Sequence, residues 1–216
     1  YRFIQKIIRH LDYLVDLHTA SFGRINSHYI GVNMALAKPA RMAALQNADI
    51  ILNSIPSIRT LRGTVTDLKI PCITLEIGSP QRFQYEMVEE SLSGIRNILI
   101  DIGMLAGELK LPKKKPVVCR SSYWLRSGKG GILTVKPNLC DFLQKNTEIA
   151  ILRDVFGDII KRYITPEKGI VIGKNTNPVA LSGARIVHLG ILEDETKVKR
   201  VFNWKEYGEW EEDFEG

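Results

Sequence analysis

The feature that most constrains the fold is a change of pattern near the middle of the chain. Up to about residue 107, short apolar runs alternate with segments whose apolar residues recur at helical spacing. After the stretch KLPKKKP, residues 110–116, only short apolar runs punctuated by glycine remain. Strands alternating with helices indicate an α/β layer with a mainly parallel sheet, whereas many short strands with turn signals indicate a small barrel or sandwich.

The first half of the chain is expected to contain three strands and three helices. The strands fall in DYLVDLHTA, DIILNSI and PCITLEIG, residues 12–20, 49–55 and 71–78. One helix is predicted over residues 38–48, where Pro39 suits the first turn, and another over 60–69, entered through Thr60. A third is predicted over residues 81–105, where apolar side chains recur with a helical period.

The second half is expected to contain strands only. They fall in the runs CRSSYWLRS, GGILTVK, TEIAILRD, DIIKRYITP, GIVIGK and ARIVHLGIL. We accordingly divide the chain into an α/β part at residues 1–112, a β-rich part at 113–196 and a tail at 197–216. The tail mixes charged and aromatic residues without a period, which fits either docking by its tryptophans or a partly ordered terminus.

Composition excludes several classes of protein. A chain of 216 residues that is 44% hydrophobic and 25% charged is typical of a globular protein, and no run approaches the ~20 apolar residues of a membrane span. Three widely spaced cysteines argue against a disulfide framework, so we expect a reducing, cytoplasmic setting. The net charge of +6 comes without interleaved arginine and aromatic residues, so we expect no nucleic-acid partner; the charge suits a small anionic substrate. The sequence leaves a homo-oligomer open.

Two residues that can carry chemistry stand at the ends of predicted strands. His18 closes one apolar run and Glu76 closes another. In open α/β sheets, ligands bind beyond the carboxyl ends of the strands, so both positions suit an active site. Taken alone, His18 is also compatible with an ordinary core histidine, and Glu76 with a capping or ion-pairing residue.

The surrounding motifs favour the functional interpretation. The segments DYLVDLHTASFGRINSHYI and IPCITLEIGSPQRFQ resemble the succinylglutamate desuccinylase/aspartoacylase family of zinc-dependent amide hydrolases. This resemblance implies a carboxypeptidase-like α/β fold, with a mainly parallel sheet and helices, followed by a small all-β, barrel-sandwich-like domain. It implies that His18 is a zinc ligand and that Glu76 is the catalytic general base.

The same resemblance suggests roles for neighbouring residues. Asp16, two positions before His18, would orient its imidazole, although a capping role fits equally. Arginines bind carboxylates through a planar fork of N–H groups. The candidates for binding a substrate carboxylate are Arg24, Arg62 and Arg82, with Asn26 and Ser21 as further pocket residues.

One part of the family pattern is missing from this sequence. The family supplies an HxxE pair of zinc ligands before the DLH strand, but no histidine in these 216 residues is followed three positions later by a carboxylate. We therefore expect that the N-terminal part of the catalytic domain precedes Tyr1 and holds those ligands. The alternative is a metal-free, non-catalytic binding or assembly module that keeps the fold.

The β-rich part also resembles biotinyl and lipoyl carrier domains in its sequence of strands, turns and glycines. Carrier domains present a modifiable lysine at a hairpin tip. The corresponding stretch of this chain, ILRDVFGDII, contains no lysine. We therefore expect no attached cofactor and a structural role for this part.

Overall fold

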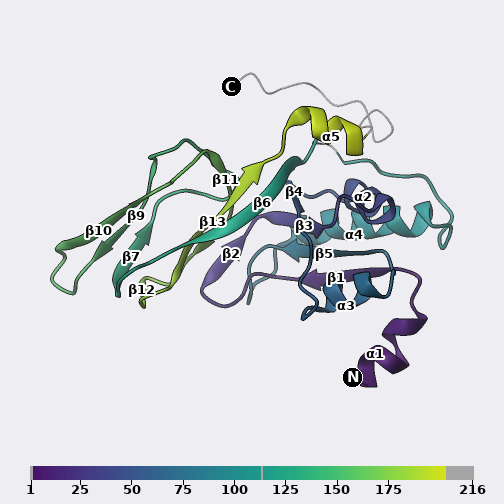
Figure 1. The fold of residues 1–216 in the computed structure, drawn as a ribbon, viewed down its shortest axis with the longest axis horizontal. Coiled ribbons are helices and arrows are strands. Elements are labelled where there is room, and N and C mark those ends of the chain that lie inside the picture. Colours follow the sequence, from purple (N-terminus) through teal and green to yellow (C-terminus); the bar gives the residue numbers. More distant parts are fainter. Residues whose placement is uncertain (1, 113, 203–216) are drawn as a thin grey trace.

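The computed structural model describes residues 2–112 and 114–202, and shows one long sheet flanked by helices at one end and by a small second sheet at the other (Figure 1). The helices are α1 (Arg2–Lys6), the 3-10 turn η1 (Ile8–His10), α2 (Ala37–Ala44), α3 (Leu61–Asp67), α4 (Tyr85–Asp101) and α5 (Glu195–Val201). The long sheet contains β1 (Leu14–His18), β2 (Arg24–Asn26), β3 (His28–Val32), β4 (Ile50–Asn53), β5 (Cys72–Ile77), β6 (Val117–Arg126), β8 (Phe142–Leu143), β11 (Gly169–Asn175) and β13 (Arg185–Leu192). The small sheet contains β7 (Gly131–Val135), β9 (Glu148–Arg153), β10 (Ile159–Ile164) and β12 (Val179–Ala180).

The elements predicted in the first half are confirmed. β1, β4 and β5 occupy the three predicted runs, α3 and α4 fall within the predicted helical segments, and α2 begins one residue before its predicted segment. Helix α3 begins after Thr60, whose hydroxyl accepts a hydrogen bond from the backbone N–H of Gly63 at 3.1 Å, as expected of an N-cap residue. The strands β2 and β3, which follow β1 closely, were not predicted.

The long sheet is mixed rather than uniformly parallel. Its order is β1-β5-β3-β4-β6-β13-β11-β2, with β8 paired to β11. The pairs β1–β5, β3–β4 and β4–β6 are parallel, which confirms the α/β expectation for this half, but β3 runs antiparallel to β5. Beyond β6 the pairing is antiparallel.

Helices cover both faces of the parallel half of the sheet (Figure 1). On one face, α2, α4 and α5 contribute to a core that includes Ala43, Ile98 and Phe202 and packs on Ile30, Ile73 and other buried strand residues. On the opposite face, η1 and α3 pack Ile8 and Val65 against Cys72. Burial of these apolar side chains fixes β1 and β5 in the sheet, and hence the residues at their ends.

The predicted strands of the second half are also confirmed, but they divide between the two sheets. β6, β11 and β13 extend the long sheet, whereas β7, β9 and β10 belong to the small one. The two sheets enclose a second core with Leu152 and Tyr163 on one side and Val187 and Leu189 on the other. This sandwich is continuous with the α/β part, because β2 from the first half pairs with β11.

The start of the predicted tail is helical. Asp194 caps α5 through its side chain, and Val198 and Phe202 pack into the same core as residues of α2 and α4. The tryptophans of the tail lie outside the described residues. No helix in the described part of the chain is long and apolar enough to cross a membrane.

Candidate active site

The parallel pairing of β1 with β5 brings the two predicted catalytic positions together. His18 and Glu76 are direct partners in the register of the two strands, and both lie at the strands' carboxyl ends. Beyond them, the backbone N–H of Ala20 donates to the carbonyl of Gly78 at 3.0 Å, which keeps the two chain segments together past the sheet. The sheet thus forms a rigid base that places both side chains at one edge.

The carboxylate of Glu76 is held by hydrogen bonds. The amide Nδ2 of Asn26 donates to Glu76 Oε2 at 3.1 Å, and the hydroxyl of Tyr29 bonds to the same side chain. Burial raises the pKa of Glu76 above its usual range, and the nearby His18 and the two hydrogen bonds oppose that rise. A half-buried carboxylate with a raised pKa, fixed in orientation, is well suited to accept a proton.

The imidazole of His18 is oriented by Asp16. Asp16 Oδ2 lies 3.0 Å from His18 Nε2, so the other ring nitrogen, Nδ1, is left for a ligand or substrate. About half of the His18 side chain is exposed, at 49%. A carboxylate behind one imidazole nitrogen is the arrangement commonly found behind metal-binding histidines.

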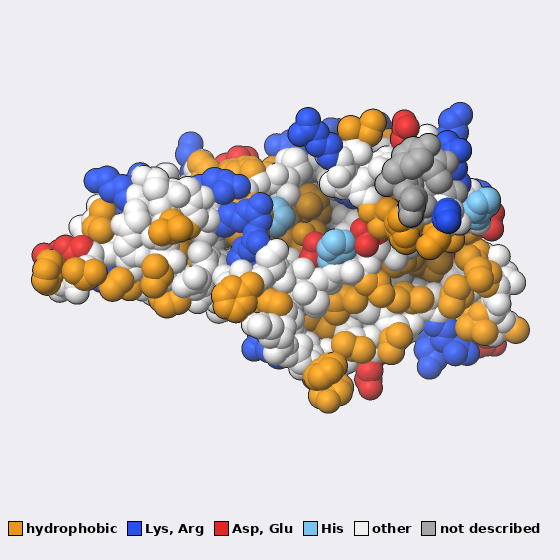
Figure 2. Space-filling model, turned by 90° about the horizontal axis from the view of Figure 1, so that it is seen from below, with side chains coloured by type: hydrophobic (Ala, Val, Ile, Leu, Met, Phe, Trp, Pro, Cys, Tyr) orange, Lys and Arg blue, Asp and Glu red, His pale blue; other side chains and the backbone are white. Residues whose placement is uncertain are grey.

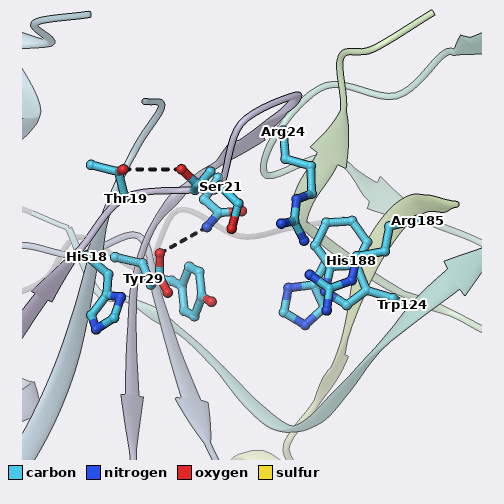
Figure 3. Close-up of a pocket in the computed structure, with 11 residues that line it drawn as sticks. His18, Thr19, Ser21, Arg24, Tyr29, Trp124, Arg185 and His188 are labelled. Atoms are coloured by element: carbon cyan, nitrogen blue, oxygen red, sulfur yellow. Dashed lines mark hydrogen bonds between the residues drawn. The ribbon is translucent and has the colours of Figure 1, made fainter. Parts of the chain in front are cut away.

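The opposite wall of the site comes from β6 and β13 of the second half of the chain, together with Arg24 of β2 (Figure 3). His188 on β13 pairs in register with Trp124 on β6, and their rings stack with centroids 4.9 Å apart. The guanidinium carbons of Arg24 and Arg185 lie 5.7 and 5.2 Å from the centroid of the same tryptophan ring. Burial, with a contribution from the charge of Arg185, lowers the pKa of His188 to about 4, so its ring is neutral at pH 7.

These two walls enclose a cavity of about 150 Å³. Figure 2 shows basic side chains on one side of a hollow and a histidine between acidic side chains on the other. The cavity is lined by His18, Thr19, Ala20, Ser21, Arg24, Asn26, Tyr29, Glu76, Trp124, Arg185 and His188. Glu76 is the only carboxylate among these residues, while two arginines are present.

Larger hollows adjoin the cavity, two of which open on either side of it. One, of about 610 Å³, shares His18 with it and is lined by Asp16 and Arg62 among others. The other, of about 690 Å³, shares Arg24 and Arg185 and carries the apolar side chains of Phe22 and Leu181. The cavity is thus a narrow polar space between two wider openings.

The structure brings most of the predicted site residues to one place. His18, Glu76, Arg24, Asn26 and Ser21 line the same cavity. Asp16 and Arg62 lie in the adjoining hollow, where Arg62 Nη2 donates to Ser54 Oγ at 2.8 Å.

Arg82 lies apart from the cavity. Its Nη2 donates to Ser79 Oγ at 3.2 Å, and it lines an outer groove that also includes Arg24.

Sequence reasoning missed Tyr29, Trp124, Arg185 and His188. The YWLR stretch and the two polar residues inside the apolar run ARIVHLGIL were the available signals. In regular alternation, Arg185 and His188 would face opposite sides of β13. A register shift between Arg185 and Val187 interrupts that alternation and allows both side chains to face the cavity.

The donor set present does not complete a zinc site. Catalytic zinc is held by three protein ligands. Within residues 2–112 and 114–202, no group of three or more His, Cys, Asp or Glu side chains is placed to bind one metal ion. His18 is therefore a single candidate ligand.

Comparison with known proteins agrees with the fold. Residues 1–102 match the sequence model described as the succinylglutamate desuccinylase/aspartoacylase catalytic domain. No curated protein sequence gives a significant match.

Solved structures resemble a larger share of the chain. The ectoine utilization protein EutE (DoeB) from Ruegeria pomeroyi, in its apo structure, superposes with a TM-score of 0.79 at 19% identity, over 88% of this chain and 63% of that one. A succinylglutamate desuccinylase from a Silicibacter species superposes with a TM-score of 0.77 at 19% identity, over 89% of this chain and 61% of that one. A succinylglutamate desuccinylase/aspartoacylase from Rhodobacter sphaeroides superposes with a TM-score of 0.76 at 18% identity, over 89% of this chain and 62% of that one. The chain thus spans less than two thirds of the length of these structures.

Proposed function

Because residues 1–102 belong to the succinylglutamate desuccinylase/aspartoacylase catalytic domain family, we propose that the protein hydrolyses the amide bond of an N-acyl amino acid or a similar small amide. The observation that carries this proposal is the placement of Glu76. Its carboxylate is oriented by Asn26, has a raised pKa and lies beside His18 at the carboxyl edge of the sheet.

In the proposed reaction, Glu76 acts as general base and then as general acid. It accepts a proton from the water that attacks the amide carbonyl, and it returns this proton to the nitrogen of the leaving amine. The hydrogen bonds from Asn26 and Tyr29 keep the carboxylate pointed into the cavity through both transfers.

Zinc is the proposed cofactor, with His18 as one of its ligands and Asp16 orienting the imidazole. When bound, zinc lowers the pKa of its water and polarises a carbonyl. Among the described residues His18 is the one candidate ligand, so we propose that the remaining ligands lie outside the residues that the structure describes.

The arginines are proposed to bind a carboxylate of a small anionic substrate. Arg24 is best placed, because its side chain lines the cavity together with Glu76. Arg62, in the hollow that shares His18, is the second candidate. Arg82 serves the outer groove and would contact only a longer substrate.

The test is amide hydrolysis by the full-length protein, assayed with a panel of N-acyl amino acids after its metal content has been measured. Glu76→Gln should keep the bound zinc and lose turnover by about 100-fold or more. The control is Glu86→Gln, an exposed glutamate on α4, which should be as active as the unchanged protein. Near-normal hydrolysis by Glu76→Gln would remove Glu76 as the general base.

The metal measurement tests the second candidate function. His18→Ala should lower the zinc content, and unchanged stoichiometry would exclude His18 as a ligand. If the full-length protein binds no zinc and hydrolyses none of the amides, the metal-free binding module replaces the enzyme. The observation behind that alternative is the lack of an HxxE pair in these 216 residues.

A further inference from the structure

Two guanidinium groups share one aromatic ring in the wall of the cavity that faces Glu76. The Cζ atoms of Arg24 and Arg185 lie 5.7 and 5.2 Å from the centroid of the Trp124 ring. The distance between the two carbons therefore cannot exceed the sum of these values. Arg24 comes from β2 and Arg185 from β13, so distant parts of the sequence bring these like charges together.

Neither charge is neutralised by the residues around it. Neither guanidinium forms an ion pair with a carboxylate of the described residues. The only carboxylate in the cavity is Glu76, and it is engaged by Asn26 and Tyr29. His188 is neutral at pH 7, so the wall carries two positive charges and no negative charge.

The way the arginines are held leaves their hydrogen-bonding edges available. A guanidinium stacked over an aromatic ring uses its face and keeps its N–H groups in the plane free to bind an anion. The tryptophan is itself fixed, because it stacks on His188, whose Nε2 lies 2.7 Å from Ser122 Oγ. The arrangement is therefore organised before any ligand arrives.

We propose that Arg24, Arg185 and Trp124 form a receptor for a carboxylate of the substrate, and that Arg185 determines specificity for anionic over neutral amides. The cavity of about 150 Å³ that these residues line also contains Glu76, so a bound anion would lie in the same space as the proposed general base. The identification of the ligand as an amide substrate rests on the proposed function, whereas the anion receptor itself does not.

Binding measured without turnover tests the receptor. The full-length protein, treated with chelator, is titrated by calorimetry with three small amides. N-acetylglycine carries its carboxylate on the amine side, N-methylsuccinamate carries it on the acyl side, and N-methylacetamide has none. At least one of the two anions should bind about tenfold or more tighter than the neutral amide, and the tighter anion identifies the side that the arginines recognise.

Variants connect the preference to Arg185. Arg185→Gln should abolish the preference for the anion, and Arg185→Lys should restore only part of it, because lysine lacks the planar fork. Arg120→Gln is the matched control, since Arg120 is an exposed residue of β6, the strand that carries Trp124. It should bind all three amides like the unchanged protein.

The outcomes separate this proposal from the proposed function. Equal binding of all three amides, or an anion preference that survives in a folded Arg185→Gln variant, would overturn the receptor whether or not the protein hydrolyses amides. Anion binding that depends on Arg185 in a protein without hydrolytic activity would keep the receptor and reject the enzyme. Circular dichroism of each variant establishes that it is folded.

Discussion

The neutral state of His188 makes stability depend on pH in a way that can be calculated. Burial lowers the pKa of His188 from 6.5 to about 4, and its side chain is 8% exposed in the folded protein. Above pH 6.5 the imidazole is neutral in both the folded and the unfolded chain. As the pH falls below 6.5, the unfolded chain binds the proton first, so the free energy of unfolding decreases until about pH 4 and then levels off.

The size of this effect follows from the shift. Each pKa unit corresponds to about 1.4 kcal/mol, so His188 should remove about 3 kcal/mol of stability over this range, most of it by pH 4.5. His28, which is buried and whose pKa is also lowered to about 4, should add a separate loss of similar size. The variant His188→Gln should therefore lose less stability on acidification than the unchanged protein, by about 2.5 kcal/mol between pH 7.5 and 4.5.

Urea denaturation at the two pH values measures this difference directly. Any loss of ring stacking in His188→Gln lowers stability at both pH values and cancels in the comparison. If His188→Gln and the unchanged protein lose equal stability on acidification, burial does not hold His188 neutral and this wall of the cavity carries a different charge.

Three further predictions concern the base of the site and helix α3. Asn26→Leu removes the donor to Glu76 Oε2, so the pKa of Glu76 should rise further and the acidic limb of kcat/KM should move to higher pH; an unmoved limb would contradict this. Thr60→Ala should lower the free energy of unfolding by about 1 kcal/mol, because it removes the side chain that caps the N-terminus of α3. Gly63→Ala should lower the free energy of unfolding, measured by urea denaturation, by more than Thr60→Ala does, because the added Cβ would lie 1.9 Å from the carbonyl oxygen of Ser57. A Gly63→Ala variant as stable as the unchanged protein would refute this close packing.

The sequence predicts local structure and the first wall of the site well, for physical reasons. Apolar periodicity reports which residues of an element are buried, and this is sufficient to place β1, β5 and the helices. His18 and Glu76 meet because both end parallel neighbouring strands. Their proximity therefore follows from strand order alone.

The second wall could not be predicted, because it depends on long-range pairing and on one irregularity. His188 meets Trp124 only through the antiparallel register of β13 on β6. The register shift after Arg185 breaks the period of two that sequence patterns rely on. A single histidine in the run ARIVHLGIL has the appearance of a core residue, and indeed His188 is buried, but its ring also borders the cavity.

The pairing of β2 with β11 has a consequence for how the protein is made. The cavity takes His18 and Arg24 from the first strands and Arg185 and His188 from the last, so it cannot exist in a nascent chain before β13 has left the ribosome. Contacts of such long sequence separation form slowly, since a large loop must close first. An incompletely synthesised chain would therefore present the histidine and glutamate edge of the sheet, with Arg24 close by in the sequence, but without Arg185, the residue proposed to select the substrate.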